Sequence, residues 1–296
     1  MVRPRDSHDL CLLEATLSID PPPERILWLH DVSGNSVAVA GFGAARSATL
    51  RLESRLLLDL CQANLPEYQI ADYARTYPFP YESEEVPDLA RIMERHYPDP
   101  EHAVDLWAKG VVRVAGPTDT YDLLTWMTRA IQATVTYAAR EEEGVQTPVE
   151  TLAKDSGSCR DLALFMMEAA RSLGFAALFV SGYLYSPDAD GSGHVGGGST
   201  HAWCQVYLPG AGWVESDPTN GITGNRDLIR VAVARDPGQA APLQGSFIGP
   251  PGAFRSLDVD VTVTDASTDE LVRPSDSLRG RPGLNRLMTH RDRSRP

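Results

Sequence analysis

The sequence predicts an α+β fold in which helices come first and an antiparallel β-sheet follows. Two amphipathic helical patterns, near residues 118–137 and 159–173, precede a part of the chain where the pattern changes to short apolar strands. From residue 175 onward, turns that contain Gly and Pro separate these strands, which is typical of neighbouring antiparallel strands. A chain of 296 residues is long enough for this core and a smaller lobe.

The first sixty residues predict a small antiparallel β unit. Residues 48–56 place mainly apolar side chains on one face and Thr, Arg and Glu on the other, which is the pattern of a half-buried strand. An apolar stretch at 12–19 ends at three prolines, and a short apolar run at 37–39 follows a Gly-Asn turn. We therefore assign residues 1–62 to an N-terminal β region.

A connector and a tail flank the predicted core, which spans residues 111–267. Residues 63–110 combine a Pro- and Tyr-rich passage with two short helical patterns near 86–95 and 103–109. Residues 268–296 are rich in Arg, Pro, Ser and Gly and lack periodicity, which predicts a disordered, solvated end. An arm that contacts a partner is the alternative for this tail.

Within the core, we expect two helices that pack on a sheet. The first carries Leu124, Met127 and Ile131 at helical spacing, and the second begins at Cys159 and stops at a glycine suited to a left-handed cap. A Pro-Gly-Ala-Gly turn joins two strands of a hairpin. The expected strands cover residues 175–185, 201–208, 213–216, 229–234 and 257–263.

The composition argues against several classes of protein. Lys and Arg number 27 against 40 Asp and Glu, and the net charge of −13 argues against general binding of nucleic acid or anionic membranes. No apolar stretch approaches the roughly 20 residues that a membrane helix requires, and no secretory signal pattern is present at the start. The four cysteines form no Cys-x-x-Cys pair, so we expect free thiols and a cytoplasmic location.

Cys159 occupies a position that favours a reactive thiol. It follows the Ser-Gly-Ser turn at 156–158 and opens the second core helix. A helix N-terminus presents unpaired N–H groups and a partial positive charge, which favour a thiolate and can donate to a developing oxyanion. A lone cysteine is usually a small buried hydrophobe, and we expect that role for Cys11, Cys61 and Cys204.

Two downstream residues complete a candidate catalytic triad. His201 opens the first strand of the predicted hairpin, and Asp217 follows the second strand, sixteen residues later. Because antiparallel strands fold back on each other, His201 can meet Asp217 across the hairpin. Cys159 would then supply the nucleophile, His201 its base, and Asp217 the group that orients the imidazole. Taken singly, His201 could be an ordinary strand histidine and Asp217 a turn residue.

At these residues the sequence resembles the transglutaminase-like superfamily in its bacterial branch. Over about residues 117–265, four blocks carry the resemblance in the same order and spacing. They are 147–161 with Gly-Ser-Cys-Arg-Asp, 173–184 with Val-Ser-Gly-Tyr-Leu, 200–213 with Thr-His-Ala-Trp, and 217–221 with Asp-Pro-Thr-Asn-Gly. The resemblance implies a papain-like core of helices on an antiparallel sheet, with a Cys159, His201 and Asp217 triad. It also implies that the N-terminal β lobe is partial, because the chain resembles only the latter part of that region.

The expected function is cysteine-dependent acyl transfer on an amide or peptide bond of a protein or peptide. Cys159 would form a thioester that water or an amine then resolves. Water makes the enzyme a peptidase or amidase, an amine makes it a protein-glutamine transamidase, and both stay open. The alternative is a catalytically silent module that binds a peptide or serves in assembly. No cofactor is expected.

Other residues near the triad carry weaker signals. Trp203, on the same strand face as His201, could line a substrate cleft or pack in the core. His194 lies in a Gly/Ser loop, where we expect it to be exposed. Residues 188–199 begin like a calcium loop but end in Ser instead of Glu, and Cys204 should point away from His201. We therefore expect no metal site.

Overall fold

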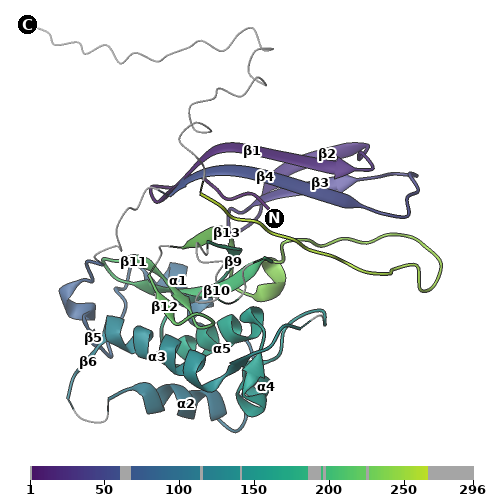
Figure 1. Cartoon of the computed structure of the whole chain (residues 1–296). Coiled ribbons are helices and arrows are strands. Elements are labelled where there is room, and N and C mark those ends of the chain that lie inside the picture. The colour runs from purple at the N-terminus through teal and green to yellow at the C-terminus, as the bar shows by residue number, and fades with distance from the viewer. Residues whose placement is uncertain are drawn as a thin grey trace, which may run out of the picture. The chain divides into compact units, whose positions relative to one another are not determined.

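The computed structural model describes residues 2–60, 68–113, 116–140, 142–185, 195, 198–224 and 227–265. The described residues up to 263 form one compact unit. The Arg-rich tail predicted at 268–296 lies outside the described residues, as do Cys61 and His194. The predicted α+β fold class is confirmed: helices pack on an antiparallel sheet (Figure 1). The domain boundaries stay a prediction.

The centre of this compact unit is an antiparallel sheet with the strand order β12-β11-β10-β9-β13. The predicted hairpin is formed by β10 and β11, with Cys204 opposite Ser216. Gly210, at φ +82°, lies in its turn, where a Cβ atom would stand only 2.6 Å from the carbonyl oxygen of Gln69. The strands are β9 (Ala177–Leu184), β10 (His201–Leu208), β11 (Gly212–Asp217), β12 (Ile222–Thr223) and β13 (Leu228–Ala234).

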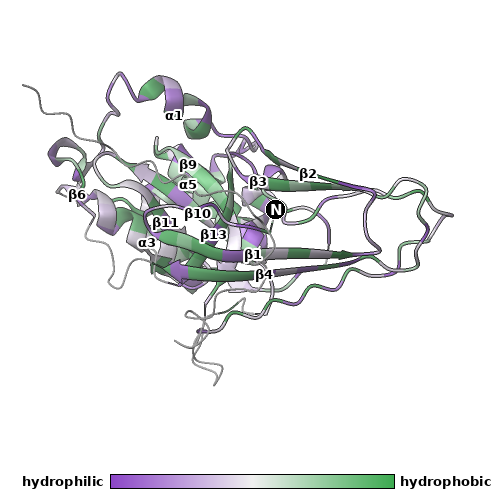
Figure 2. Cartoon of the chain, turned by 90° about the horizontal axis from the view of Figure 1, so that it is seen from above, coloured by the Kyte–Doolittle hydropathy of each residue, from purple (hydrophilic) through white to green (hydrophobic). Residues whose placement is uncertain are grey.

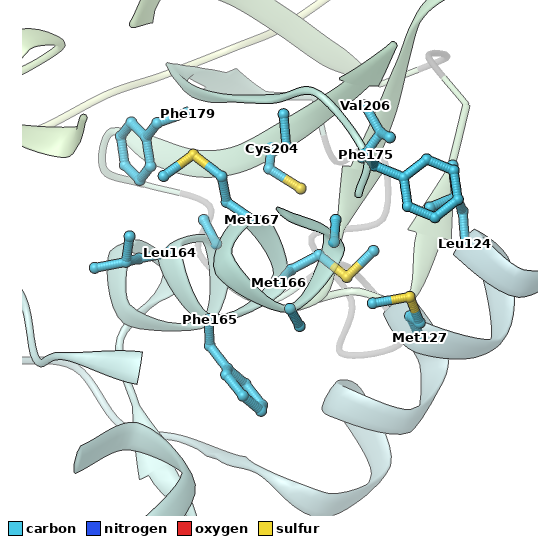
Figure 3. Close-up of a cluster of buried hydrophobic side chains, with 14 of the residues drawn as sticks. Leu124, Met127, Leu164, Phe165, Met166, Met167, Phe175, Phe179, Cys204 and Val206 are labelled. Carbon is cyan, nitrogen blue, oxygen red and sulfur yellow. The ribbon is translucent and has the colours of Figure 1, made fainter. Parts of the chain in front are cut away.

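Helix α5 (Cys159–Ser172) is the central helix of the unit, and nearly all its residues are buried. It packs against β9 and β10 on one side and against three other helices on the other. In Figure 3, Met167 points toward Phe179 and Cys204 of the sheet, whereas Met166 points toward Met127 of α3. The remaining helices are α1 (Val86–Met93), α2 (Ala103–Val111), α3 (Thr120–Thr134) and α4 (Pro148–Lys154).

None of the helices in the described ranges is both long and apolar enough to cross a bilayer. Two 3₁₀ turns, Asp72–Ala74 and Pro237–Gln239, flank the core elements. Short strand pairs tie the connections together: β5 (Thr76–Tyr77) with β6 (Thr118–Asp119), and β7 (Thr136–Tyr137) with β8 (Ser156–Gly157). The pairing of β7 with β8 is parallel and brings the end of α3 beside the start of α5.

The N-terminal β region is antiparallel, as predicted, and consists of two separate two-stranded ribbons. Strand β1 (Leu10–Asp20) pairs with β4 (Arg51–Leu60), and β2 (Arg25–His30) pairs with β3 (Ser36–Gly41). Apolar residues run along β2 (Figure 2), yet every residue of this strand is exposed. These ribbons therefore bury little apolar surface compared with the core around α5.

Asn35, in the turn between β2 and β3, connects the N-terminal β region to the five-stranded sheet. Its side chain is 2% exposed, its Nδ2 donates to the carbonyl oxygen of Val233 at 2.7 Å, and its Oδ1 accepts from the N–H of Val233 at 2.9 Å. Both backbone groups of Val233 are thus satisfied by one amide. This contact occupies part of the outer edge of β13.

The strand predicted at residues 257–263 is wrong. The segment is irregular, and its apolar side chains Leu257 and Val259 are 62% and 51% exposed. Alternation of apolar and polar residues favours a strand only where a sheet edge offers hydrogen bonds. Part of the β13 edge is taken by Asn35, and the N–H of Val261 donates to the carbonyl oxygen of Gly198 instead.

Candidate active site

Cys159 is the first residue of α5, as the sequence predicts, and follows directly on strand β8 and Ser158. The extended backbone of Ser158 at the N-cap turns the chain from the strand into the helix. Cys159 therefore lies where the helix presents its unpaired N–H groups and the positive end of its dipole. Its side chain lies at the rim of the core, with the residue 8% exposed.

Asp161 stabilises the N-terminus of α5. Its fully buried carboxylate accepts hydrogen bonds from Ser158 N at 2.8 Å, Gln146 N at 2.7 Å and Arg140 Nη1 at 2.9 Å. Burial by itself would raise the pKa of this carboxyl, but the backbone donors and the guanidinium outweigh it and lower the pKa. A charged Asp161 thus ties the chain at residues 140–146 to the turn that carries Cys159.

His201 and Asp217 are in contact, as the sequence predicts. His201 Nε2 lies 2.8 Å from Asp217 Oδ2, and both side chains are fully buried. His201 is the first residue of β10 and Asp217 the last of β11, so the antiparallel hairpin brings them together. The carboxylate also accepts from Thr219 N at 2.9 Å and from Asn220 Nδ2 at 2.8 Å.

The surroundings of His201 favour its protonated form. Burial alone would lower its pKa, but the charge and hydrogen bond of Asp217, with a smaller contribution from Cys159, raise the pKa of His201 to about 10. Nδ1 is buried and has no partner with hydrogen-bond geometry within the described chain. Because Nε2 faces Asp217, Nδ1 is the ring nitrogen left for the sulfur of Cys159. The structure thus joins His201 to Asp217, and Cys159 is near enough to contribute to the raised pKa of His201.

Trp203 packs behind His201 and is fully buried. The two rings stack with centroids 5.9 Å apart, and the indole N–H donates to the carboxylate of Glu215. Glu215 also accepts from Gln205 Nε2 and from Arg230 Nη1, each at 2.7 Å. Burial raises the pKa of Glu215, although Arg230 opposes this rise. The substrate contact of Trp203 stays a prediction, and this buried position gives it no support.

Cys204 faces the opposite side of β10 from Trp203, as expected. It belongs to the core cluster around α5 (Figure 3), whereas Trp203 packs with Val180 and Leu184 in a separate cluster. Cys204 is fully buried, and burial raises the pKa of its thiol. Among the described residues, no group of three His, Cys, Asp or Glu side chains is arranged to hold a metal ion. Of the loop at 188–199, only positions 195, 198 and 199 are described.

Comparison with known proteins matches two segments to family models. Residues 108–218 match the transglutaminase-like superfamily, and residues 1–59 match the bacterial transglutaminase-like N-terminal region. The first segment contains Cys159, His201 and Asp217. Residues 108–218 therefore belong to the transglutaminase-like superfamily.

The chain is also similar to two uncharacterized mycobacterial proteins. One from Mycobacterium leprae is 34% identical over 116 residues, which is 39% of this chain and 40% of that protein. One from Mycobacterium tuberculosis is 33% identical over 127 residues, which is 41% of this chain and 40% of that protein. The matched segments thus span about 40% of these relatives' own length.

A solved structure shares the fold. The crystal structure of a candidate cysteine protease from Cytophaga hutchinsonii superposes with a TM-score of 0.58 at 18% identity. The match covers 81% of this chain and 76% of that one, so the similarity extends beyond the transglutaminase-like core.

Three residues of the transglutaminase-like site were not predicted from the sequence. Asp161 could have been found, because Ser-x-x-Asp at 158–161 is a helix-start pattern. Tyr137 is brought beside Gly157 by the pairing of β7 with β8, and its pKa is raised by burial and by the charge of Cys159. Asn220 reaches Asp217 only through the turn after β11. Asn220 lies within the 217–221 block of the family resemblance, but that block does not indicate its contacts, and no sequence signal marks Tyr137.

Proposed function

We propose that this protein is a cysteine-dependent acyltransferase or hydrolase that acts on amide or peptide bonds. The main support for the proposal is the buried ion pair of His201 with Asp217. It leaves the Nδ1 atom of His201 available to Cys159 at the start of α5. A nucleophile, its base and the group that orients the base are the minimum set for acyl transfer through a thiol. The family to which the core belongs supports this proposal.

In the first half of the reaction, Cys159 reacts as a thiolate paired with protonated His201. The sulfur attacks the carbonyl carbon of the substrate, and the negative charge moves to the carbonyl oxygen. The backbone N–H of Cys159, at the helix start, donates to that oxygen. When the tetrahedral intermediate collapses, the C–N bond breaks, His201 gives its proton to the departing amine, and a thioester remains.

The raised pKa of His201 is compatible with this proton donation. Part of the rise comes from the negative charge on Cys159. That charge disappears once sulfur is bonded to carbon, so the imidazolium becomes a better acid at the step in which the leaving amine needs a proton. Asp217 keeps the ring oriented throughout.

In the second half, an acceptor attacks the thioester and gives its proton to neutral His201. The C–S bond then breaks, which regenerates the Cys159 thiolate beside protonated His201. With water as acceptor, the other product is a carboxylic acid, as in a peptidase or amidase. With an amine such as a lysine side chain, the product is a new amide, as in a transamidase. Both acceptors remain part of the proposal, with a protein or peptide as substrate and the cytoplasm as the expected location.

The proposal is tested first by alkylation of Cys159 with iodoacetamide at neutral pH. We expect rapid labelling of the wild type, no labelling at this site in Cys159→Ala, and labelling slowed at least about tenfold in His201→Ala, because the thiolate loses its cation. Thr134→Ala, on the exposed end of α3, is the control and should label like the wild type. Equal labelling of His201→Ala and wild type would contradict an activated pair.

Acyl transfer itself is then measured with glutamine-containing and other peptides, with and without a primary amine. Release of ammonia or of a peptide fragment without amine identifies hydrolysis, and amine incorporation identifies transamidation. Turnover in neither assay, together with unchanged labelling of His201→Ala, would favour a silent binding module instead.

A further inference from the structure

Asn220 makes an unusual set of contacts beside the triad. It lies in the turn between β11 and β12, three residues after Asp217. Its Nδ2 donates to Asp217 Oδ2 at 2.8 Å and to the carbonyl oxygen of Val195 at 3.2 Å. Its Oδ1 accepts from the N–H of Val195 at 2.7 Å. One amide thus contacts the carboxylate of the triad and both backbone groups of a residue six positions before His201.

These contacts use both N–H donors and the carbonyl oxygen of the amide. A side-chain amide offers two N–H donors and one carbonyl acceptor. One donor goes to Asp217, and the other donor and the acceptor go to Val195. The bond to the carboxylate is charge-assisted and therefore among the stronger hydrogen bonds in a protein.

The turn itself does not need the Asn220 side chain. Asp217 Oδ1 already accepts from the backbone N–H groups of Thr219 and Asn220, at 2.9 and 3.4 Å, which closes the turn. Gly221 supplies the positive φ of +68°. The Asn220 amide is instead directed at Oδ2, the oxygen that faces His201.

We propose that Asn220 is a positioning residue of the triad, and that it holds Asp217 Oδ2 toward His201 while anchoring the chain at Val195. The inference rests on the proposed function for its effect on turnover. The backbone N–H groups at Oδ1 and the Asn220 amide at Oδ2 together keep the carboxylate from rotating about its Cβ–Cγ bond. His201 Nε2 then meets an oxygen that is already in place, and Nδ1 stays aimed at Cys159.

The test compares Asn220→Ala and Asn220→Asp with the wild type in two measurements. The first is the titration of the His201 ring followed by ¹⁵N NMR, and the second is the pH profile of acyl transfer. Among the described residues, the charge of Asp217 acts on His201 and on Cys204, and Cys159 also acts on His201. Nε2 of His201 lies against Oδ2. Asn35→Ala is the matched control, because Asn35 also binds a backbone segment but lies away from the triad.

In Asn220→Ala, we expect the His201 midpoint to fall from about 10 by about one pH unit, and turnover to fall at least about tenfold. Asn220→Asp places two carboxyls side by side, so the introduced one should stay protonated to a higher pH and donate to Asp217 in place of the amide. Its turnover should therefore approach the wild-type value at low pH and fall as that carboxyl ionises. Asn35→Ala should leave the His201 midpoint unchanged.

An unchanged His201 midpoint in Asn220→Ala overturns the proposal, and so does an Asn220→Asp pH profile that matches the wild type. The first of these outcomes is separate from a failure of the proposed function. The His201 titration needs no substrate, so it tests the positioning role even if no acyl donor is turned over. A lower melting temperature with an unchanged midpoint would make Asn220 a structural residue only, which also overturns the proposal.

Discussion

His201 Nε2 and Asp217 Oδ2 lie 2.8 Å apart with neither side chain exposed to solvent. A pair in this position is not screened by salt as surface pairs are, so each partner depends on the other for compensation of its charge. This dependence links the stability of the core to the protonation of a single imidazole.

The first prediction concerns this link to pH. The pKa of His201 is raised from an unfolded value of about 6.5 to about 10. Its stabilising contribution is therefore fully present below about pH 6.5 and is lost as the pH rises toward 10. We expect the free energy of unfolding of the wild type to fall across this window, and that of Asp217→Asn to fall much less. Urea unfolding at a series of pH values measures both, and parallel curves would contradict the assignment.

The second prediction concerns the anchor of the α5 start. Asp161→Ala leaves the donors of Ser158, Gln146 and Arg140 without their acceptor, so we expect a loss of about 3–5 kcal/mol in the free energy of unfolding. The matched control is Glu142→Ala, which removes an exposed partner of the same Arg140 and should produce no measurable change. Equal effects of the two substitutions, measured by urea unfolding, would show that Asp161 is not the anchor.

The third prediction concerns the buried carboxylate behind Trp203. Glu215 and Arg230 are 2.7 Å apart, and Glu215 is almost fully buried. A double-mutant cycle with Glu215→Gln and Arg230→Gln should give a coupling energy of about 1–3 kcal/mol. The exposed pair of Glu53 with Arg55 serves as the comparison and should show no measurable coupling. Thermal or urea unfolding of the single and double variants provides the numbers.

The fourth prediction concerns the second thiol near the site. Cys204 is fully buried, and burial raises the pKa of its thiol, so it should resist iodoacetamide in the native protein. Peptide mapping after alkylation should find the label on Cys159 and find it on Cys204 only after unfolding. Cys204→Ala should retain acyl transfer. Native labelling of Cys204 at a rate similar to that of Cys159 would mean that the sheet opens at β10.

The parts of the fold that could be predicted from the sequence are those with strong local signals. The start of α5 is marked by a Gly/Ser turn followed by a regular apolar stripe, and the hairpin by a Pro-Gly-Ala-Gly turn between apolar runs. Helix α4 was missed because it has only seven residues, although Thr147 and Glu150 form a capping box at its start. The wrong prediction of a strand at 257–263 has another cause. Alternation of apolar and polar residues indicates that the two faces of a segment differ, but it does not indicate whether a sheet edge is free to pair with that segment.

The residues of the candidate site also fall into those that local signals predict and those that they do not. Cys159, His201 and Asp217 could be predicted because a helix start and the two strands of one hairpin fix their neighbours by geometry. Tyr137 and Asn220 could not, because their contacts depend on how separate loops meet. Asn220 and Val195 are far apart in the sequence, and no periodic pattern of residues links them. Only the folded structure therefore shows that the Asn220 amide connects the two segments.

Asn35 also limits how the protein can associate. Its amide gives Val233 the donor and the acceptor that a neighbouring strand would otherwise supply. A strand from another copy therefore cannot form its hydrogen bonds at this point of β13 without displacing the side chain. Since open strand edges are where sheets polymerise, a single buried amide in a hairpin turn makes fibre growth from this edge less favourable.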